Sequence, residues 1–402
     1  MAGDGQSLTL GDVVTLQRGT TYKSALLGQD GPVLLGLASI QRNGGFRDDN
    51  LKTYGGDSPE KLTLRPGDIY VSLKDVTQSA DLLGAIARVP PHIQTGRVTQ
   101  DTVKLSFTRK DIPSEFLYWL LRTPVYREYC RAHAIGTTNL SLSRDDFLAF
   151  PVPKPKAREL TLVETLDALD DKIELNRRMN ETLEALAQTI FKNRFVDATA
   201  TKLPKGWRAG TLGEVTENPR RGIQPDEIKS STPYIGLEHM PRRCIALSDW
   251  GHADALESNK FEFEHGEILF GKLRPYFHKV GVAPVDGVCS TDILVVRPKA
   301  PEWFGFVLGH VSSVELVNHT HAASTGTKMP RANWNDIARF EVALPPDTLA
   351  AEFTDLIRPM IDRIIANIHE SRTLAELRDA LLPKLLSGEL RVPAAHTKEA
   401  AI

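Results

Sequence analysis

The chain of 402 residues contains two copies of one pattern, and this internal repeat limits its fold more than any local motif. Thr9–Gly19 reads TLGDVVTLQRG, and about 200 residues later Thr211–Gly222 reads TLGEVTENPRRG. Leu64–Lys74 (LRPGDIYVSLK) has a counterpart in Phe263–Leu273 (FEHGEILFGKL). The matches occur in the same order in both halves, while their spacing drifts as loop insertions would cause. We therefore expect two copies of one module of roughly 190–200 residues.

A similar phrase closes each module. Residues 136–153 read GTTNLSLSRDDFLAFPVP, and residues 326–346 read GTKMPRANWNDIARFEVALPP. Both phrases begin with Gly-Thr, so Thr137 and Thr327 offer hydroxyl groups, beside backbone N–H groups, that can hold a phosphate. The alternative is a turn that only directs the last strand of the module.

The part of each module before the closing phrase has the pattern of short strands. Runs such as GDVVTLQRG, GDIYVSL and DTVKLSF are separated by turns rich in Gly, Pro and Asp. Apolar residues within Glu115–Cys130 predict one helix there. Each module is thus expected to begin with a mixed α/β domain.

After each closing phrase the pattern becomes that of a long helix. Residues 160–195 contain no Pro or Gly, and alternating steps of three and four residues define a heptad seam. The first seam runs through Leu162, Leu166, Leu169, Ile173, Asn176, Asn180, Leu183, Ala187 and Ile190. The second runs through Phe353, Ile357, Met360, Ile364, Asn367, Ser371, Leu374, Arg378 and Leu381. Two such helices related by an internal twofold axis would pack as an antiparallel coiled coil.

Three residues qualify this coiled-coil prediction. Asn176 and Asn367 occupy the same seam position of the two copies, where a polar residue costs stability but sets the register. The alternative is that each long helix only packs against a domain, with its Asn side chain at the edge of the contact. Pro359 predicts that the second helix starts later or is kinked, and Arg378 interrupts the apolar seam.

The predicted fold class is α+β, with two mixed α/β domains in a pseudo-twofold tandem repeat, separated by two long helices packed as an antiparallel coiled coil. The predicted parts are a first domain (1–155), a first long helix (156–200), a second domain (201–346), a second long helix (347–390) and a flexible tail (391–402).

Composition excludes several classes of protein. The formal net charge is −2, so no global basic field is present, although local patches decide nucleic-acid binding. Cys130, Cys244 and Cys289 are isolated and fit neither a disulfide framework nor a CxxC metal site. The N-terminus has no signal-peptide pattern, and no segment is apolar enough to span a membrane. We expect a soluble, cytoplasmic protein.

No segment of the chain matches a catalytic or metal-binding motif completely. Gly266–Leu273 (GEILFGKL) fits GxxxxGK but has Leu273 where a phosphate loop needs Ser or Thr, and Pro275 where its helix would begin. Pro225–Lys229 (PDEIK) places the two parts of a nuclease-like signature too close together to surround a metal. The chain also lacks the glycine-rich cofactor loop and the strand-end motif of a base methyltransferase. These absences favour a binding protein.

Basic and aromatic residues instead recur in equivalent loops of both copies. The loop Gly271–Val280 (GKLRPYFHKV) contains Lys272, Arg274, Tyr276, His278 and Lys279, and SLKDVTQS takes its place in the first copy. Lys and Arg suit phosphates, while Arg, Gln, Thr and Asn can read base edges. The candidate DNA contacts are Arg18, Tyr22, Lys23, Lys74, Thr137, Arg220, Arg221, Lys272, Arg274, Tyr276, Thr327 and Lys328.

With this organisation, the chain resembles the specificity subunits of type I restriction–modification systems over nearly its whole length. The resemblance rests on GDIYVSLK, GTTNLSLSRDDFLAFPVP, FKNRFVD, LPKGW, GEILFGKLRPY, CSTDILVVRP and LLPKLLSGEL. It implies two target-recognition domains that each read one half of an asymmetric, interrupted sequence of double-stranded DNA. It also implies that the two long helices act as a spacer.

The resemblance further implies a subunit without catalytic activity or a cofactor of its own. Its partners would be two modification subunits that methylate adenine with S-adenosylmethionine, and restriction subunits that use ATP and Mg²⁺ to translocate and cut DNA. Two other functions remain open from the residues alone. One is a coiled-coil adaptor that never contacts DNA, and the other is a stand-alone DNA-modifying enzyme with an unrecognised site.

Overall fold

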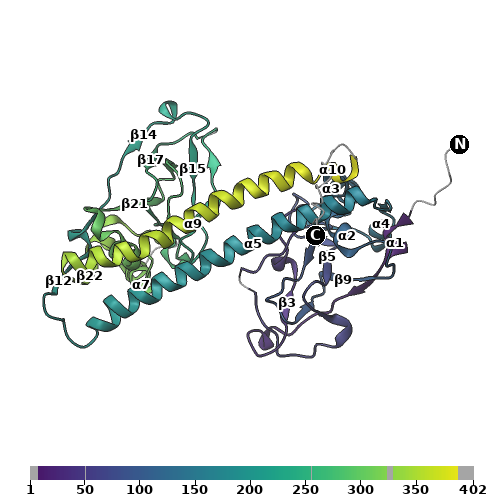
Figure 1. Cartoon of the computed structure of the whole chain (residues 1–402), viewed down its shortest axis with the longest axis horizontal. Coiled ribbons are helices and arrows are strands. Elements are labelled where there is room, and N and C mark those ends of the chain that lie inside the picture. The colour runs from purple at the N-terminus through teal and green to yellow at the C-terminus, as the bar shows by residue number, and fades with distance from the viewer. Residues whose placement is uncertain (1–7, 50, 255, 324–328, 388–402) are drawn as a thin grey trace, which may run out of the picture. The chain divides into compact units, whose positions relative to one another are not determined.

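The computed structural model describes residues 8–49, 51–254, 256–323 and 329–387, and the chain divides into two compact units. Unit 1 comprises residues 1–170 and 376–402, and unit 2 comprises residues 171–375. Each unit therefore combines one mixed α/β domain with segments of both long helices (Figure 1).

The main sheet has the same strand order in both units. In unit 1 the order is β2-β9-β5-β7, formed by Val14–Arg18, Thr102–Phe107, Ile69–Ser72 and Ile86–Arg88. In unit 2 the order is β13-β21-β18-β19, formed by Thr216–Glu217, Ile293–Pro298, Ile268–Gly271 and Val280–Val282. All neighbours in both sheets are antiparallel. The repeat read from the sequence is thus a repeat of topology.

The smaller sheets repeat as well. In unit 1, β8 (Gly96–Val98) lies between parallel β3 (Val33–Leu35) and antiparallel β4 (Thr63–Leu64). In unit 2, β20 (Gly287–Cys289) lies between parallel β15 (Pro233–Ile235) and antiparallel β17 (Lys260–Phe263), and β14 (Gly222–Ile223) and β16 (Gly251–His252) extend the sheet. A two-stranded ribbon closes each domain, β1 (Leu8–Thr9) with β11 (Pro151–Val152), and β12 (Arg208–Thr211) with β22 (Glu341–Leu344).

Among the described residues, three short α-helices follow the main sheet in each unit. They are α2 (Ser114–Leu120), α3 (Pro124–Ala132) and α4 (Arg144–Leu148) in unit 1, and α6 (Phe304–Val311), α7 (Val314–Ala323) and α8 (Trp334–Ala338) in unit 2. The prediction of one helix over Glu115–Cys130 is wrong. Thr123 accepts a hydrogen bond from the Tyr126 N–H, and Pro124 follows at the first helical position, so a second helix starts there.

The two long helices are α5 (Ala157–Phe191) and α9 (Asp347–Leu381), each of 35 residues. A π-helical turn at Lys192–Val196 and a 3-10 turn at Asp197–Thr199 follow α5, and the short helix α10 (Lys384–Ser387) follows α9. The predicted later start near Pro359 is wrong, because α9 begins at Asp347 and includes Pro359. Lacking an N–H, Pro359 leaves the Asp355 carbonyl without its usual intrahelical partner. The predicted tail 391–402 lies outside the described residues.

Within unit 2 the two long helices pack antiparallel, side by side (Figure 1). The Asn176 side chain donates to Ser371 Oγ at 3.2 Å, whereas Asn180, one turn later, accepts from Asn367, one turn earlier. Below this polar layer, Phe191, Phe353 and Ile357 join the apolar core of the domain. Within unit 1, Leu162 and Leu166 of α5 join a separate core with Leu382 and Leu385, which follow α9.

Candidate nucleic-acid interface

In both units, the loop after the central strand of the main sheet lies against the closing phrase of the domain. In unit 1, β6 (Lys74–Asp75) pairs antiparallel with β10 (Leu140–Ser141), and the Leu142 N–H donates to Leu73 O at 3.0 Å. In unit 2, Leu273 forms an antiparallel bridge with Arg331, and the Ala332 N–H donates to Lys272 O at 2.9 Å. Two segments that the sequence analysis selected separately therefore form one surface in each unit.

The loop of unit 2 has an unusual backbone. Arg274 (φ 51°) and His278 (φ 50°) are both left-handed and enclose a 3-10 turn at Pro275–Phe277. Such conformations are uncommon for residues with side chains and persist where the surroundings impose them. Here the buried His278 ring bonds Ser312 O at 2.9 Å through Nε2, and burial lowers the pKa of His278. The loop is thus held from beneath by a neutral imidazole that donates through Nε2.

This turn presents cations and aromatic rings together. Tyr276 is 46% exposed. The Phe277 ring is next to it. The Arg242 guanidinium lies over this ring, 4.0 Å from the ring centroid, and the Arg274 guanidinium lies 6.0 Å from the same centroid. Arg274 Nε is buried with no hydrogen-bond partner among the described residues. Cations stacked on rings beside an exposed tyrosine suit a phosphate backbone and unstacked bases.

Sequence reasoning missed Arg242. Its signal was the Arg-Arg pair at positions 242–243, of the same kind as the pair Arg220–Arg221 that was selected. The two lysines of this surface differ in burial and in the partners they already have. Lys272 is half-buried and adjacent to the bridge, while Lys279 donates through Nζ to Leu237 O and has a pKa lowered by burial.

The two arginines after the first strand of unit 2 differ. Arg220 is exposed and left-handed, with φ 47°. Arg221 forms ion pairs with the carboxylates of Glu267 and, at 3.3 Å, Glu264. Arg220 is therefore available to an outside anion, whereas Arg221 is occupied by carboxylates of its own unit.

In unit 1 the candidate residues form two groups. Lys74 pairs with Asp101 at 3.0 Å, and Arg18 Nε donates to the neighbouring Gln100 O at 3.3 Å. Tyr22 packs edge-on against Tyr54, whose hydroxyl accepts from the Lys23 backbone N–H at 3.3 Å. Arg18, Tyr22, Lys23 and Lys74 are all exposed.

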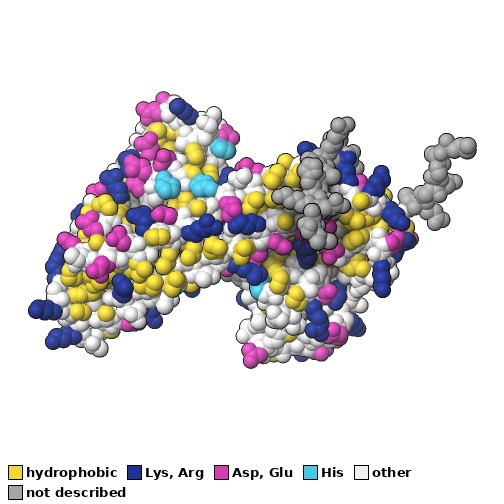
Figure 2. All heavy atoms as spheres, in the orientation of Figure 1, with side chains coloured by type: hydrophobic (Ala, Val, Ile, Leu, Met, Phe, Trp, Pro, Cys, Tyr) yellow, Lys and Arg dark blue, Asp and Glu magenta, His cyan; other side chains and the backbone are white. Residues whose placement is uncertain are grey.

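The Gly-Thr starts of the closing phrases can be compared only in part. Thr137 is exposed, and Gly136 before it is left-handed with φ 112°, close to the Asn139 carbonyl. Thr327 and Lys328 lie outside the described residues. Figure 2 shows basic and acidic side chains mixed over the visible surface of each unit, so the candidate contacts are local features rather than one basic field.

The polar layer between the long helices is built from equivalent residues of the two copies. Asn176 and Asn367 are both fully buried, and each bonds across to the other helix. Asn176 also donates to Glu370 at 2.8 Å and accepts from Lys172 at 3.0 Å. Asn367 donates to Asn180 Oδ1 at 2.8 Å, while its own Oδ1 has no partner among the described residues. A register-setting role for these residues stays a prediction, because the contacts show where the polar groups lie and not what another register would cost.

Replacing Asn367 with leucine is expected to destabilise the protein by about 1–3 kcal/mol, because Asn180 is left buried without its cross-helix donor. Replacing Asn180 and Asn367 together with leucine removes both polar groups and should recover most of that loss. Thermal unfolding of the two variants measures the difference, with Ala366→Leu at an exposed neighbour as control. A double variant less stable than the single one would contradict the pairing.

No family model matches the chain. The specificity subunit of the type I restriction enzyme MjaIX from Methanocaldococcus jannaschii is 28% identical over 308 residues, covering 70% of each chain. The EcoDI specificity subunit of Escherichia coli is 24% identical over 326 residues, covering 69% of this chain and 70% of that one. The chain belongs to the specificity subunits of type I restriction enzymes. This confirms the resemblance drawn from the sequence motifs.

The fold agrees with this assignment. The S subunit of a type I restriction–modification system from M. genitalium superposes with a TM-score of 0.60 at 14% identity, covering 96% of this chain and 98% of that one. The specificity-subunit family is non-catalytic. Within the described ranges, no group of three or more His, Cys, Asp or Glu side chains could hold a metal ion. No helix in the part of the chain that the structure describes is long and apolar enough to cross a membrane.

Proposed function

We propose that this specificity subunit reads a bipartite, asymmetric sequence of double-stranded DNA, with residues 1–155 reading one half and residues 201–346 the other. The observation that supports this most is the repeated surface described above. Both units join the loop after the central strand to the closing phrase by the same backbone pairing, yet they present different side chains. Lys74 and Ser141 stand in unit 1 where Leu273 and Arg331 stand in unit 2. One frame with two sets of side chains suits two different half-sites.

The residues proposed to contact DNA follow from exposure and from the partners they already have. In unit 2 they are Lys272, Arg274 and Tyr276, with Arg242 added from the structure and Arg220 beside them. In unit 1 they are Lys74, Arg18, Tyr22, Lys23 and Thr137. The cations are proposed mainly as phosphate contacts, which position the protein on the duplex, and the polar and aromatic groups as candidates for base contacts. Thr327, Lys328 and Arg221 belong to the same proposal from their sequence positions.

The long helices are proposed as the spacer between the two half-sites, with residues 156–200 and 347–390 as its two segments. In this role the polar layer around Asn176 and Asn367 sets the helix register. Changing that register would change the spacing of the half-sites.

The proposed partners are two modification subunits, which methylate adenine with S-adenosylmethionine, and restriction subunits, which use ATP and Mg²⁺. The subunit itself needs no cofactor in this scheme, and its place of action is the cytoplasm. An exposed leucine occurs at the same place in the two long helices: Leu186 is 45% exposed and Leu377 is 48% exposed. We propose these two equivalent positions as parts of two equivalent docking faces. The mass of the complex formed with the modification subunit would show whether two copies bind.

Replacing Lys272 and Arg274 together with alanine is expected to weaken DNA binding about 10- to 100-fold and to lower the slope of log affinity against log salt by about 2, because two phosphate contacts are lost. Fluorescence anisotropy of a labelled duplex, with modification subunits present, measures both quantities. Lys202→Ala with Lys205→Ala, two exposed lysines of the same unit, is the matched control. A purely structural adaptor predicts no change in DNA affinity for either pair.

A further inference from the structure

Unit 1 contains a cavity of about 400 Å³ whose wall is dominated by arginine. It lies where the loop 41–44, the segment 122–131 that includes most of α3, and the end of α9 come together. Five arginines line it, and they come from all three of these segments: Arg42, Arg122, Arg127, Arg131 and Arg378. Asp379 is the one acidic side chain among the described residues of the wall.

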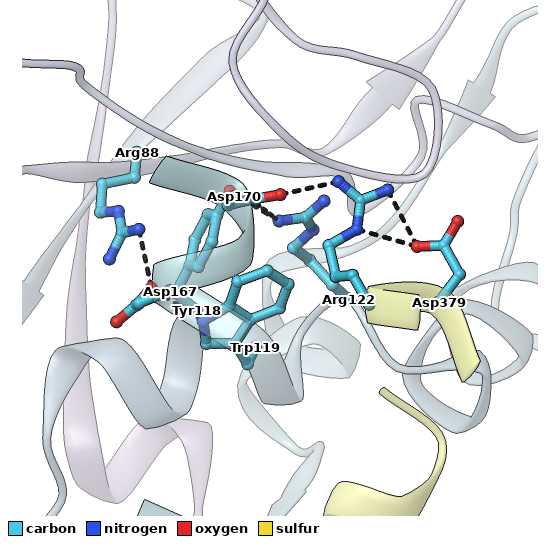
Figure 3. Close-up of polar contacts among 8 residues, drawn as sticks. Arg88, Tyr118, Trp119, Arg122, Asp167, Asp170 and Asp379 are labelled. Atoms are coloured by element: carbon cyan, nitrogen blue, oxygen red, sulfur yellow. Dashed lines mark hydrogen bonds and ion pairs between the residues drawn. The ribbon is translucent and has the colours of Figure 1, made fainter. Parts of the chain in front are cut away.

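The carboxylates around this cavity do not balance its arginines. Asp170 bonds Arg122 at 2.8 Å and Arg378 at 2.7 Å, so one carboxylate serves two guanidinium groups (Figure 3). Arg378 also pairs with Asp379 at 2.9 Å, while Asp81 lies 4.0 Å from Arg131. Five guanidinium groups thus face three carboxylates among the described residues, which leaves an excess of two positive charges.

Arg127 is a buried arginine among those that no carboxylate of the described residues pairs with. It is 3% exposed, and its terminal nitrogens donate to the carbonyl oxygens of Leu83 at 2.6 Å, Ala80 at 2.8 Å and Asp81 at 3.0 Å. Its Nε has no hydrogen-bond partner among the described residues. A buried guanidinium bonded only to neutral carbonyl groups is costly unless an anion lies close to it.

Two further arginines have donors to spare. Arg42 is exposed and makes no hydrogen bond or ion pair with the described residues through its side chain. Among the described residues, the partners of Arg131 are Asn43 Oδ1 at 3.4 Å and Asp81 at 4.0 Å. Guanidinium groups present paired N–H donors that match the oxygens of phosphate.

We propose that this cavity is a binding site for a phosphate dianion, in which Arg42, Arg127 and Arg131 supply the charge and the donors. Two negative charges would balance the excess, and the cavity has room for a phosphate group with a small substituent. The phosphate belongs either to a DNA backbone or to a free phosphate compound. This site does not depend on the proposed reading of DNA sequence.

The test is a titration of the full chain with inorganic phosphate at constant ionic strength, followed by isothermal calorimetry and by the shift in melting temperature. We expect saturable binding at one site, and Arg42→Ala and Arg131→Ala should each weaken it about tenfold or more, as loss of one charged hydrogen bond implies. Arg144→Ala, at an exposed arginine of α4 in the same unit, is the control and should bind like the unmodified chain. Both pocket variants should keep the melting temperature of the phosphate-free protein.

Absence of saturation, or equal phosphate affinity in the unmodified chain, Arg42→Ala and Arg131→Ala, would overturn the site. A second titration with a short DNA duplex separates the sources. If the backbone supplies the phosphate, the duplex competes with inorganic phosphate and Arg42→Ala weakens DNA binding. If a free compound supplies it, phosphate binds equally with and without DNA. Because phosphate binding is measured without DNA, failure of the proposed DNA reading would leave this result unchanged.

Discussion

Replacing Asp170 with asparagine is expected to lower the free energy of unfolding by about 3 kcal/mol, because removing one partner of a buried ion pair leaves the other charges uncompensated. Asp170 accepts from both Arg122 and Arg378, and the three side chains are 22%, 7% and 17% exposed. The arginine that interrupts the apolar seam is therefore accommodated by an acid on the other long helix. For a unit of this size, such a loss corresponds to a melting temperature about 6–12 °C lower.

The control for this variant is Asp171→Asn, the exposed neighbour. Differential scanning calorimetry of both variants measures the loss, and equal melting temperatures would refute the role of Asp170. The effect should also depend on pH. Burial acts to raise the pKa of Asp170, but the charges of Arg122 and Arg378 outweigh it and hold the pKa below 3.8. The stabilisation is therefore present above about pH 4 and lost as the pH falls through the lowered pKa of the folded state.

Glu184 gives the second large effect, in which the stability falls as the pH rises. It is 7% exposed on α5, and both carboxyl oxygens accept from the Ile245 backbone N–H at 3.1 Å. Burial raises the pKa of Glu184 to about 7, although the hydrogen bonds of Ile245 and Cys244 act to lower it. Between pH 4.5 and 7 the folded state thus retains a proton that the unfolded state has released. Stability should therefore fall by about 3 kcal/mol as the pH rises through this range.

Glu184→Gln should lack this dependence, since its side chain stays neutral while one oxygen still accepts from Ile245. Urea unfolding at pH 5, 6, 7 and 8 measures the difference between the two proteins, which cancels the titration of other groups. Glu352→Gln, at an exposed glutamate of α9, should follow the unmodified protein. Parallel pH profiles for the unmodified chain and Glu184→Gln would show that Glu184 titrates normally.

Much of the fold could be predicted from the sequence because duplication and periodicity are properties of the chain itself. The repeated phrases predicted the repeated topology, and the heptad seam correctly identified two long helices packed antiparallel. Asn176 and Asn367 were found by the same reasoning, and both are buried in the polar layer. Of the two outcomes predicted for Pro359, the later start is wrong, because a proline in a packed helix costs one hydrogen bond but can lie inside the helix.

The candidate interface could be predicted only in parts. Its loops were selected correctly as equivalent positions, but their contact with the closing phrases depends on pairing between distant strands, such as Leu273 with Arg331. Arg242 joins the surface because its guanidinium packs over the Phe277 ring, and no local sequence pattern indicates this contact. The arginine-lined cavity likewise requires Arg42, Arg127 and Arg378 to meet from three segments far apart in the chain.

Each half of the chain is proposed to read one half of the DNA target. A domain exchange tests this proposal: residues 1–155 are replaced by the corresponding domain of a relative with a different target. The adenines methylated by the resulting complex with its modification subunits are then mapped across a genome. We expect a hybrid motif in which one half-site is replaced while the other half-site and the gap are unchanged. An unchanged motif, or a change in both halves, would contradict it.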